Sequence, residues 1–199
     1  MRFRGLLCAG LCLALAGPAL VYGQEGSAAS AQKTFTPAPI APADSLNALL
    51  ALMQSQVVGA ADAMPADKYD FAPPTTYGTF AGVRTFGQQV KHLAEANYEF
   101  FHGFGIPGAV DPKTIEALKT KDDIMKALKD SYAYAHAAIA TITPENAFMS
   151  MPGPAQYKLT HVSFAAFCLA HSMDHYGQMV EYLRMNGIIP PASRQQGSM

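Results

Sequence analysis

The sequence predicts an all-α fold, a four-helix bundle with long crossover loops. Apolar residues recur at helical spacing in four separate segments, and no segment shows the strict alternation of a half-buried strand. The connections, residues 64–84, 103–120 and 143–159, are each long enough to cross an end of the bundle. A simple series of up-and-down hairpins is therefore not required.

The first helix is expected over residues 44–63, with Asp44 or Ser45 as its cap. Its apolar stripe consists of Leu46, Leu49, Leu50, Met53 and Val57. The second helix should begin at Thr85, because TFGQ matches a capping box in which Thr and Gln each satisfy a free backbone N–H. We expect it to stop at Gly103.

The third helix is expected to start after Thr120 and to end before Pro144. One stripe carries Ile124, Leu128, Tyr132, Ala135 and Ile139. The fourth helix is expected over residues 160–186, where Gly187 can supply a left-handed cap. Pro190 and Pro191 should prevent the helix from resuming.

Composition limits the classes of protein and partner. The chain has 199 residues, half of them hydrophobic, which is enough for one core and one domain. Its formal net charge of -1, without a basic run, offers no electrostatic footprint for nucleic acid or an anionic membrane. Dimerisation through a helix face is compatible with the sequence but not required by it.

Residues 1–23 are expected to form a secretion signal. Arg2 and Arg4 give it a positive start, and the apolar run over residues 6–16 is too short to span a bilayer comfortably. An uncleaved membrane anchor is the alternative, which the early Gly17-Pro18 and the polar residues after it disfavour. We therefore expect an exported protein, periplasmic or secreted, without stable membrane insertion after cleavage.

The remaining chain divides into a linker, one domain and a tail. Residues 24–43 have the composition of a disordered linker, residues 44–193 should form the folded domain, and residues 194–199 a flexible tail. Cys8 and Cys12 lie in the predicted signal, so cleavage would leave Cys168 alone. Because one cysteine cannot form an intrachain disulfide, the domain must be held by its core, or by a core plus a metal.

The stretch HSMDHYGQ, residues 171–178, places two histidines four apart in a helix. In an α-helix that spacing separates the two side chains by about 40° around the helix axis and about 6 Å along it. Both imidazoles can therefore share one ion. A zinc protease would need Glu directly after His171, and Ser172 stands there instead. Asp174 points about 100° away from His175 and is a poor substitute. We therefore exclude the protease interpretation.

A third ligand has to come from another helix. His161 lies about 15 Å along the same helix, too far to reach the ion. His102 lies at the glycine-flanked end of the second helix, and His136 in the third helix could equally be a surface or packing residue. His92, in the middle of the second helix and flanked by apolar residues, is the best candidate.

These motifs together resemble the DinB-like superfamily of metal-dependent bundles. The resemblance rests on His92, on HxxxHYGQ in the fourth helix and on the GIIPPAS segment after it, and covers residues 44–193. It implies an up-down-down-up bundle, with two parallel helices joined by residues 103–120. It also implies a divalent ion, zinc or nickel, held by three histidines and open toward a cleft at one end of the bundle. These histidines correspond to His92, His171 and His175.

Several residues near these histidines could assist them. Glu95 shares the face of His92 and is a candidate general base, while Tyr98 and Gln178 could hydrogen-bond around the site. Each has an ordinary alternative: Glu95 a solvated charge, Tyr98 a core aromatic, and Gln178 a packing or solvent contact. Cys168, three residues before His171, is more often a small buried hydrophobe than a ligand.

Three functions are compatible with this pattern. The first is an exported metal-dependent enzyme acting on a small molecule, because a three-histidine ion can lower the pKa of its water to about 7 or activate a thiolate. Some members of the family that the chain resembles are thiol S-transferases using bacterial thiols, and others resemble hydrolases; export favours a hydrolytic reaction. The second is a non-catalytic metal- or ligand-binding module of the cell envelope. The third is a bundle whose histidines bind nothing.

Overall fold

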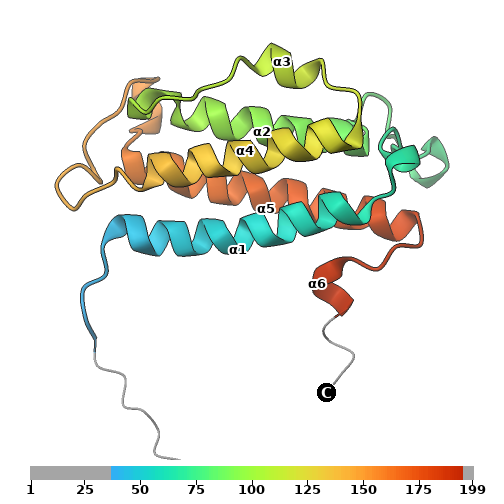
Figure 1. The fold of residues 1–199 in the computed structure, drawn as a ribbon, viewed down its shortest axis with the longest axis horizontal. Coiled ribbons are helices and arrows are strands. Elements are labelled where there is room, and N and C mark those ends of the chain that lie inside the picture. Colours follow the sequence, from blue (N-terminus) through green and yellow to red (C-terminus); the bar gives the residue numbers. More distant parts are fainter. Residues whose placement is uncertain (1–36, 195–199) are drawn as a thin grey trace, which may run out of the picture. The chain divides into compact units, whose positions relative to one another are not determined.

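The computed structural model describes residues 37–194, and this part of the chain is helical. Its four long helices are α1 (Pro42–Ala63), α2 (Phe86–Phe101), α4 (Lys121–Ile139) and α5 (His161–Met185), shown in Figure 1. No strand occurs between residues 37 and 194 apart from an isolated bridge of Ser150 with Thr160. The all-α prediction is confirmed. The predicted signal, most of the linker and residues 195–199 lie outside the described residues.

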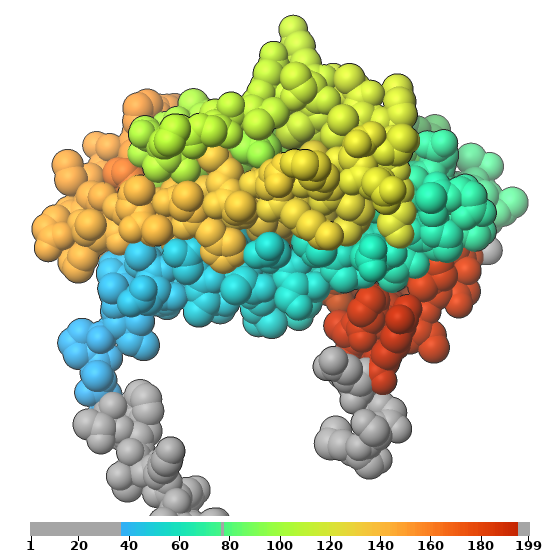
Figure 2. All heavy atoms as spheres, viewed as in Figure 1, coloured from blue at the N-terminus to red at the C-terminus, as the bar shows by residue number. Residues whose placement is uncertain are grey.

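The four long helices pack in a closed pattern. Helix α1 packs against α4 and α5, and α2 packs against the same two helices. In Figure 1, α1 and α5 run in one direction, while α2 and α4 run in the other. Side chains of α1 and α4 lie against one another along the face seen in Figure 2. None of the helices in residues 37–194 has the length and apolar character needed to cross a membrane.

Side-chain caps fix the starts of three long helices where the sequence predicts them. The capping box of α2 is confirmed, since the Thr85 hydroxyl accepts from the Gln88 N–H and the Gln88 side chain accepts from the Thr85 N–H. Thr120 caps α4, and Thr160 caps α5 through a second capping box with Ser163. At the end of α5, Gly187 adopts the left-handed conformation with φ of 71°.

Other helix ends differ from the prediction. Helix α1 begins at Pro42 without a side-chain cap, because proline has no N–H that needs a partner there. Helix α2 ends at Phe101 and continues as a 3-10 turn, so the left-handed residue is Gly105, with φ of 73°, and not Gly103. Proline also begins a helix after α5, where the short α6 (Pro191–Arg194) forms despite the expected stop.

The core confirms one predicted stripe and corrects another. Every member of the α4 stripe is buried: Ile124, Leu128, Tyr132, Ala135 and Ile139. On α1, Leu50 and Val57 are fully buried, but Leu49 is 49% exposed. Adjacent residues of a helix point about 100° apart, and here Leu50 faces the core while Leu49 points toward solvent.

The connections contain short ordered turns that place residues beside α2. The segment before α2 is fastened by the backbone N–H groups of Phe86 and Gly87, which donate to the carbonyls of Phe71 and Tyr69. Helix α3 (Pro112–Glu116) packs against α2 from the other connection. The Lys91 ammonium fastens it by donating to the Glu116 carbonyl at 2.7 Å. Both connections therefore border the N-terminal half of α2, where His92 lies.

Candidate metal centre

The structure brings the three predicted histidines together. His92 projects from α2, and His171 and His175 project from α5 toward it. Ring centroids are 5.1 Å apart for His92 and His171, 4.8 Å for His92 and His175, and 4.4 Å for His171 and His175. One ring nitrogen of each histidine lies within 4.8 Å of those of the other two. Nitrogens bound to one ion lie at most about 4.2 Å apart, so the separations would have to shorten by no more than about 0.6 Å for all three to bind the same ion.

The nitrogen atoms of the cluster fit a metal ion. His171 Nε2 is buried and has no hydrogen-bond partner among the described residues. A buried polar atom without a partner is costly in a folded protein, and a metal ion would satisfy it. The chemistry of the donor set also fits, because three imidazoles are the ligands of many zinc sites that keep an open position.

All three histidines are held in their neutral form. Burial, then the Arg84 charge and His171, lower the pKa of His92 to about 4. Burial and the two neighbouring histidines lower the pKa of His175 to about 4, and burial also lowers the pKa of His171. Neutral imidazole is the form that binds metals, so no proton has to leave at neutral pH.

Gln89 fixes the tautomer of His175. Gln89 Oε1 lies 2.5 Å from His175 Nδ1, and an amide oxygen can only accept, so Nδ1 carries the proton and Nε2 keeps its lone pair. The Gln89 amide is oriented in turn, since its Nε2 donates to Gln178 Oε1 at 2.8 Å. Gln178 Nε2 donates to the Asp174 carboxylate at 3.1 Å, which accepts only. This relay, Asp174–Gln178–Gln89, presents His175 Nε2 to the cluster.

Aromatic side chains close one side of the cluster. The Phe100 ring lies edge-on to His171, with centroids 5.3 Å apart, and Phe167 lies 6.2 Å from the same ring. Phe100 and Phe167 also contact each other at 5.1 Å. These two rings cover one side of His171, and Phe167 is itself 57% exposed.

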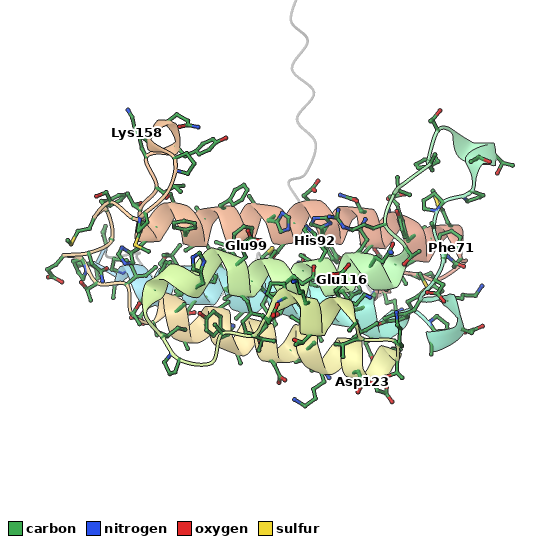
Figure 3. All side chains as sticks on the ribbon, turned by 90° about the horizontal axis from the view of Figure 1, so that it is seen from above. Phe71, His92, Glu99, Glu116, Asp123 and Lys158 are labelled. Atoms are coloured by element: carbon green, nitrogen blue, oxygen red, sulfur yellow. The ribbon has the colours of Figure 1, made fainter. Side chains whose placement is uncertain are left out.

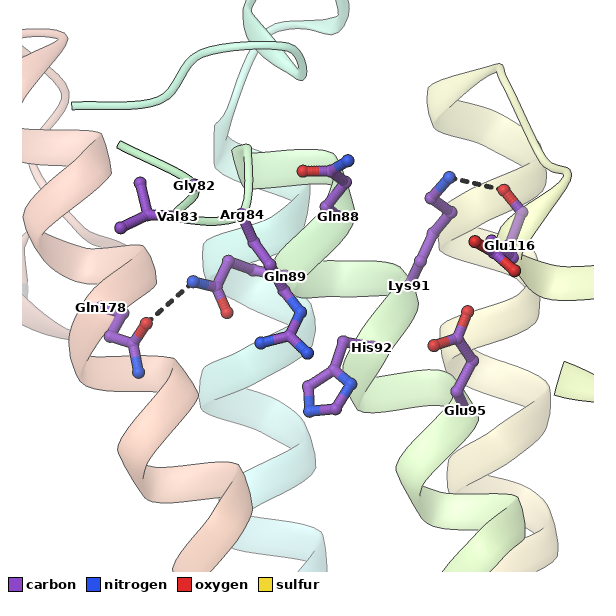
Figure 4. Close-up of a pocket in the computed structure, with 10 residues that line it drawn as sticks. All are labelled: Gly82, Val83, Arg84, Gln88, Gln89, Lys91, His92, Glu95, Glu116 and Gln178. Atoms are coloured by element: carbon purple, nitrogen blue, oxygen red, sulfur yellow. Dashed lines mark hydrogen bonds between the residues drawn. The ribbon is translucent and has the colours of Figure 1, made fainter. Parts of the chain in front are cut away.

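A pocket of about 610 Å³ borders the cluster at His92. His92 lines it together with Arg84, Gln89, Glu95 and Glu116, as Figure 4 shows. Figure 3 places His92 midway between Phe71 near one end of the helices and Lys158 near the other. The histidines therefore lie midway along the helices, and the pocket beside them extends from Gly82 in the connection before α2 to Glu95.

Glu95 lies where a proton acceptor could act. It is half-buried in the same pocket as His92, three residues further along α2. Burial raises the pKa of its carboxyl, and the nearby Glu116 carboxylate raises it further, against Lys91 and Arg84, which lower it. Such a carboxyl is a stronger base than an exposed glutamate. Tyr98, by contrast, is buried in the core beside Tyr134.

The other candidates lie elsewhere. His161 packs against Phe104, and His102 is exposed and bonded to the Glu99 carbonyl. His136 lies between α4 and α1, within hydrogen-bond distance of Asn47 and Gln54. Cys168 is fully buried, and its thiol donates to Asn97. None of these four residues belongs to the three-histidine cluster.

Sequence reasoning missed two residues of the site, Gln89 and Arg84. Gln89 precedes His92 by three positions and shares its face, a signal that could have found it. Arg84 lies in the connection before α2, where no helical spacing applies, so its approach to the cluster depends on how that connection folds. Gln178 was expected near the site, and the structure places it in the relay.

Fold and site together define an all-helical protein whose described part holds three clustered histidines that could bind one metal ion. The family model of the DinB superfamily matches residues 49–179, a range that contains all three histidines. The chain belongs to the DinB superfamily. A comparison with curated proteins finds no match.

Proposed function

We propose that this protein is an exported member of the DinB superfamily that binds a divalent metal ion, zinc or nickel, through His92, His171 and His175. The observation that carries the proposal is the cluster itself, in which one ring nitrogen of each histidine lies within 4.8 Å of those of the other two. The buried His171 Nε2 atom, without a partner in the described part of the chain, supports it. Three neutral imidazoles meeting at one point, with a pocket beside them, suit a metal site open to a small molecule.

The same proposal includes an up-down-down-up arrangement of the four long helices. Asn97 on α2 bonds to Ser131 on α4, and Tyr134 further along α4 bonds to the Phe101 carbonyl, which supports parallel helices. The contacts of α2 with α5 run the other way, since Gln89 bonds to Gln178 whereas Asn97, further along α2, bonds to the earlier Cys168. Two parallel helices need a long connection, which residues 103–120 supply.

We further propose that the site performs metal-dependent hydrolysis or group transfer on a small molecule. A divalent ion supplies Lewis-acid chemistry, by polarising a substrate oxygen or acidifying a water molecule. Gln89 would orient His175, Phe100 and Phe167 would cover one side of His171, and Glu95, which lines the pocket, would accept a proton. Hydrolysis is favoured over transfer to a bacterial thiol, because such thiols are cytosolic and the sequence predicts export.

A non-catalytic metal- or ligand-binding module is the second candidate. One observation favours it: among the described residues no carboxylate hydrogen-bonds directly to any of the three histidines, so Asp174 reaches His175 only through two amides. A site that only holds an ion or a ligand requires no acid or base beside its ligands.

A substrate screen distinguishes the two candidates. Zinc-loaded and nickel-loaded protein, purified without an affinity tag, is assayed on carboxylic esters, phosphate esters, amides and thiol acceptors. The control is the triple variant His92→Gln, His171→Gln, His175→Gln, checked for native helicity. Turnover by the loaded protein that the triple variant lacks supports an enzyme. Metal binding without turnover of any class supports the binding module, and no metal binding contradicts both.

Export needs its own test. Fusion of residues 1–43 to a reporter that is active only outside the cytosol should give active reporter and a cleaved junction near Gly23. Replacement of Arg2 and Arg4 by Glu should retain the reporter inside the cell. An active reporter that keeps residues 1–23 attached would support the membrane anchor instead.

A further inference from the structure

The pocket carries a positive charge that the metal centre does not explain. Arg84 lines the pocket with His92 and Gln89, and Figure 4 shows its guanidinium reaching toward the His92 ring. A permanent cation there repels a divalent ion and weakens metal binding, so its benefit must lie elsewhere.

The backbone of Arg84 is fixed while its side chain remains available. The Tyr182 hydroxyl on α5 donates to the Arg84 carbonyl at 3.0 Å, and Thr85 directly after it caps α2. In residues 37–194 no carboxylate oxygen lies within 4.0 Å of the guanidinium, and no side chain of this range accepts a hydrogen bond from it. Its donors are therefore free for a ligand in the pocket.

The charged side chains of the pocket are distributed unevenly between its two ends. The Lys91 ammonium already donates to the carbonyls of Glu116 and Leu118, at 2.7 Å and 3.3 Å. Glu95 and Glu116 lie near Lys91, across His92 from the Arg84 side chain (Figure 4). An anionic group is attracted to the Arg84 end and repelled from the Glu95 end, so a bound anion would have one preferred orientation.

We propose that Arg84 binds an oxyanion, a carboxylate or phosphate group, of the small molecule that this site takes. The inference rests on the proposed function, because an oxyanion held by Arg84 would direct the adjacent part of the same small molecule toward the three histidines. The planar guanidinium can donate two parallel N–H bonds to either kind of oxyanion. A pocket of about 610 Å³ has room for such a molecule. The substrate class is a small carboxylate or phosphate ester.

Calorimetry on the full chain tests this role with two readouts besides activity. Zinc is titrated first, and Arg84→Gln should bind it several-fold more tightly than the wild type because a repelling charge is gone. Acetate and inorganic phosphate are then titrated into the zinc-loaded proteins. The wild type should bind one of them at least about tenfold more tightly than Arg84→Gln, with Arg84→Lys between them. The tighter probe identifies the class of oxyanion.

Lys91→Gln is the matched control, since it removes the other cation of the pocket and should leave probe binding unchanged. Equal binding of both probes by wild type and Arg84→Gln overturns the inference, and zinc binding in the same samples leaves the proposed function intact. Failure of the wild type to bind zinc contradicts the proposed function. In that case the probes are titrated into the metal-free proteins, where a difference between wild type and Arg84→Gln supports the oxyanion site and equal binding overturns it.

Discussion

Gln89 Oε1 on α2 lies 2.5 Å from His175 Nδ1 on α5. This contact joins the two helices that carry the cluster and decides which nitrogen of His175 faces His92 and His171. Because both Gln89 and His175 are buried, water cannot easily replace the bond. The orientation of the metal centre therefore depends on an amide that is not itself a ligand.

Replacing Gln89 by Leu should weaken zinc binding by about 10- to 100-fold, since the acceptor that fixes His175 is lost. Gln89→Glu keeps an acceptor and should retain most of the affinity, although a buried carboxylate is worse for packing. Competition with a chromophoric chelator measures both. Gln56→Leu on α1, outside the site, is the control. Equal weakening by Gln89→Leu and Gln89→Glu would indicate that Gln89 acts only through packing.

The metal-free protein should lose stability as the pH falls from about 6.5 to 4. The folded-state pKa of His92 and of His175 is lowered to about 4, so the unfolded chain takes up protons first. Stability is greatest above pH 6.5 and falls below it, by about 1 kcal/mol for each of the two histidines after screening. Urea unfolding at several pH values measures it, and His92→Gln, His175→Gln should flatten the curve. An unchanged slope in that variant would contradict the lowered pKa values.

Two helical glycines should respond to alanine in opposite ways. A Cβ atom at Gly87 would lie 3.0 Å from the Tyr69 ring and 3.2 Å from the Tyr69 carbonyl oxygen, so Gly87→Ala should destabilise by about 1–3 kcal/mol. At Gly177 the Cβ meets nothing within 4 Å, and Gly177→Ala should stabilise by about 0.5–1 kcal/mol. Thermal unfolding compares them. Stabilisation by both substitutions would mean that α2 can move away from Tyr69.

The Cys168 thiol should be inert in the folded protein. Cys168 is fully buried in the core, and burial raises the pKa of its thiol to about 12. In a chain with Cys8→Ser and Cys12→Ser, a disulfide reagent should modify Cys168 only at the rate of unfolding. Denatured protein, which should react at once, gives the reference. Rapid modification without denaturant would show that the contact with Asn97 opens in the native state.

Much of this fold follows from local signals in the sequence. Thr85, Thr120 and Thr160 begin helices where they were expected, because a capping side chain acts within three residues of itself. The spacing of four brought His171 and His175 to one face for the same local reason. Pro42 and Pro191 show the limit of such local signals. Each begins a helix, α1 and α6, although Pro191 was expected only to stop one.

The parts that could not be predicted depend on contacts between distant segments. Arg84 reaches the pocket because its connection is fastened to α5 by Tyr182, 98 positions further along the chain. Gln89 acquires its role from Gln178, 89 positions away, and no spacing within α2 reveals that partner. The pocket likewise combines residues of the connection before α2, such as Gly82 and Arg84, with His92 on α2 and Gln178 on α5, a combination that no local spacing predicts.

The most direct test of the account is a crystal structure of the zinc-loaded protein, with anomalous diffraction recorded on both sides of the zinc absorption edge. We expect one zinc peak per chain, at about 2.0–2.1 Å from a ring nitrogen of His92 and from the Nε2 atoms of His171 and His175. His175 Nδ1 should remain bonded to Gln89. A cluster without a zinc peak, or a zinc ion held by other residues, would contradict it.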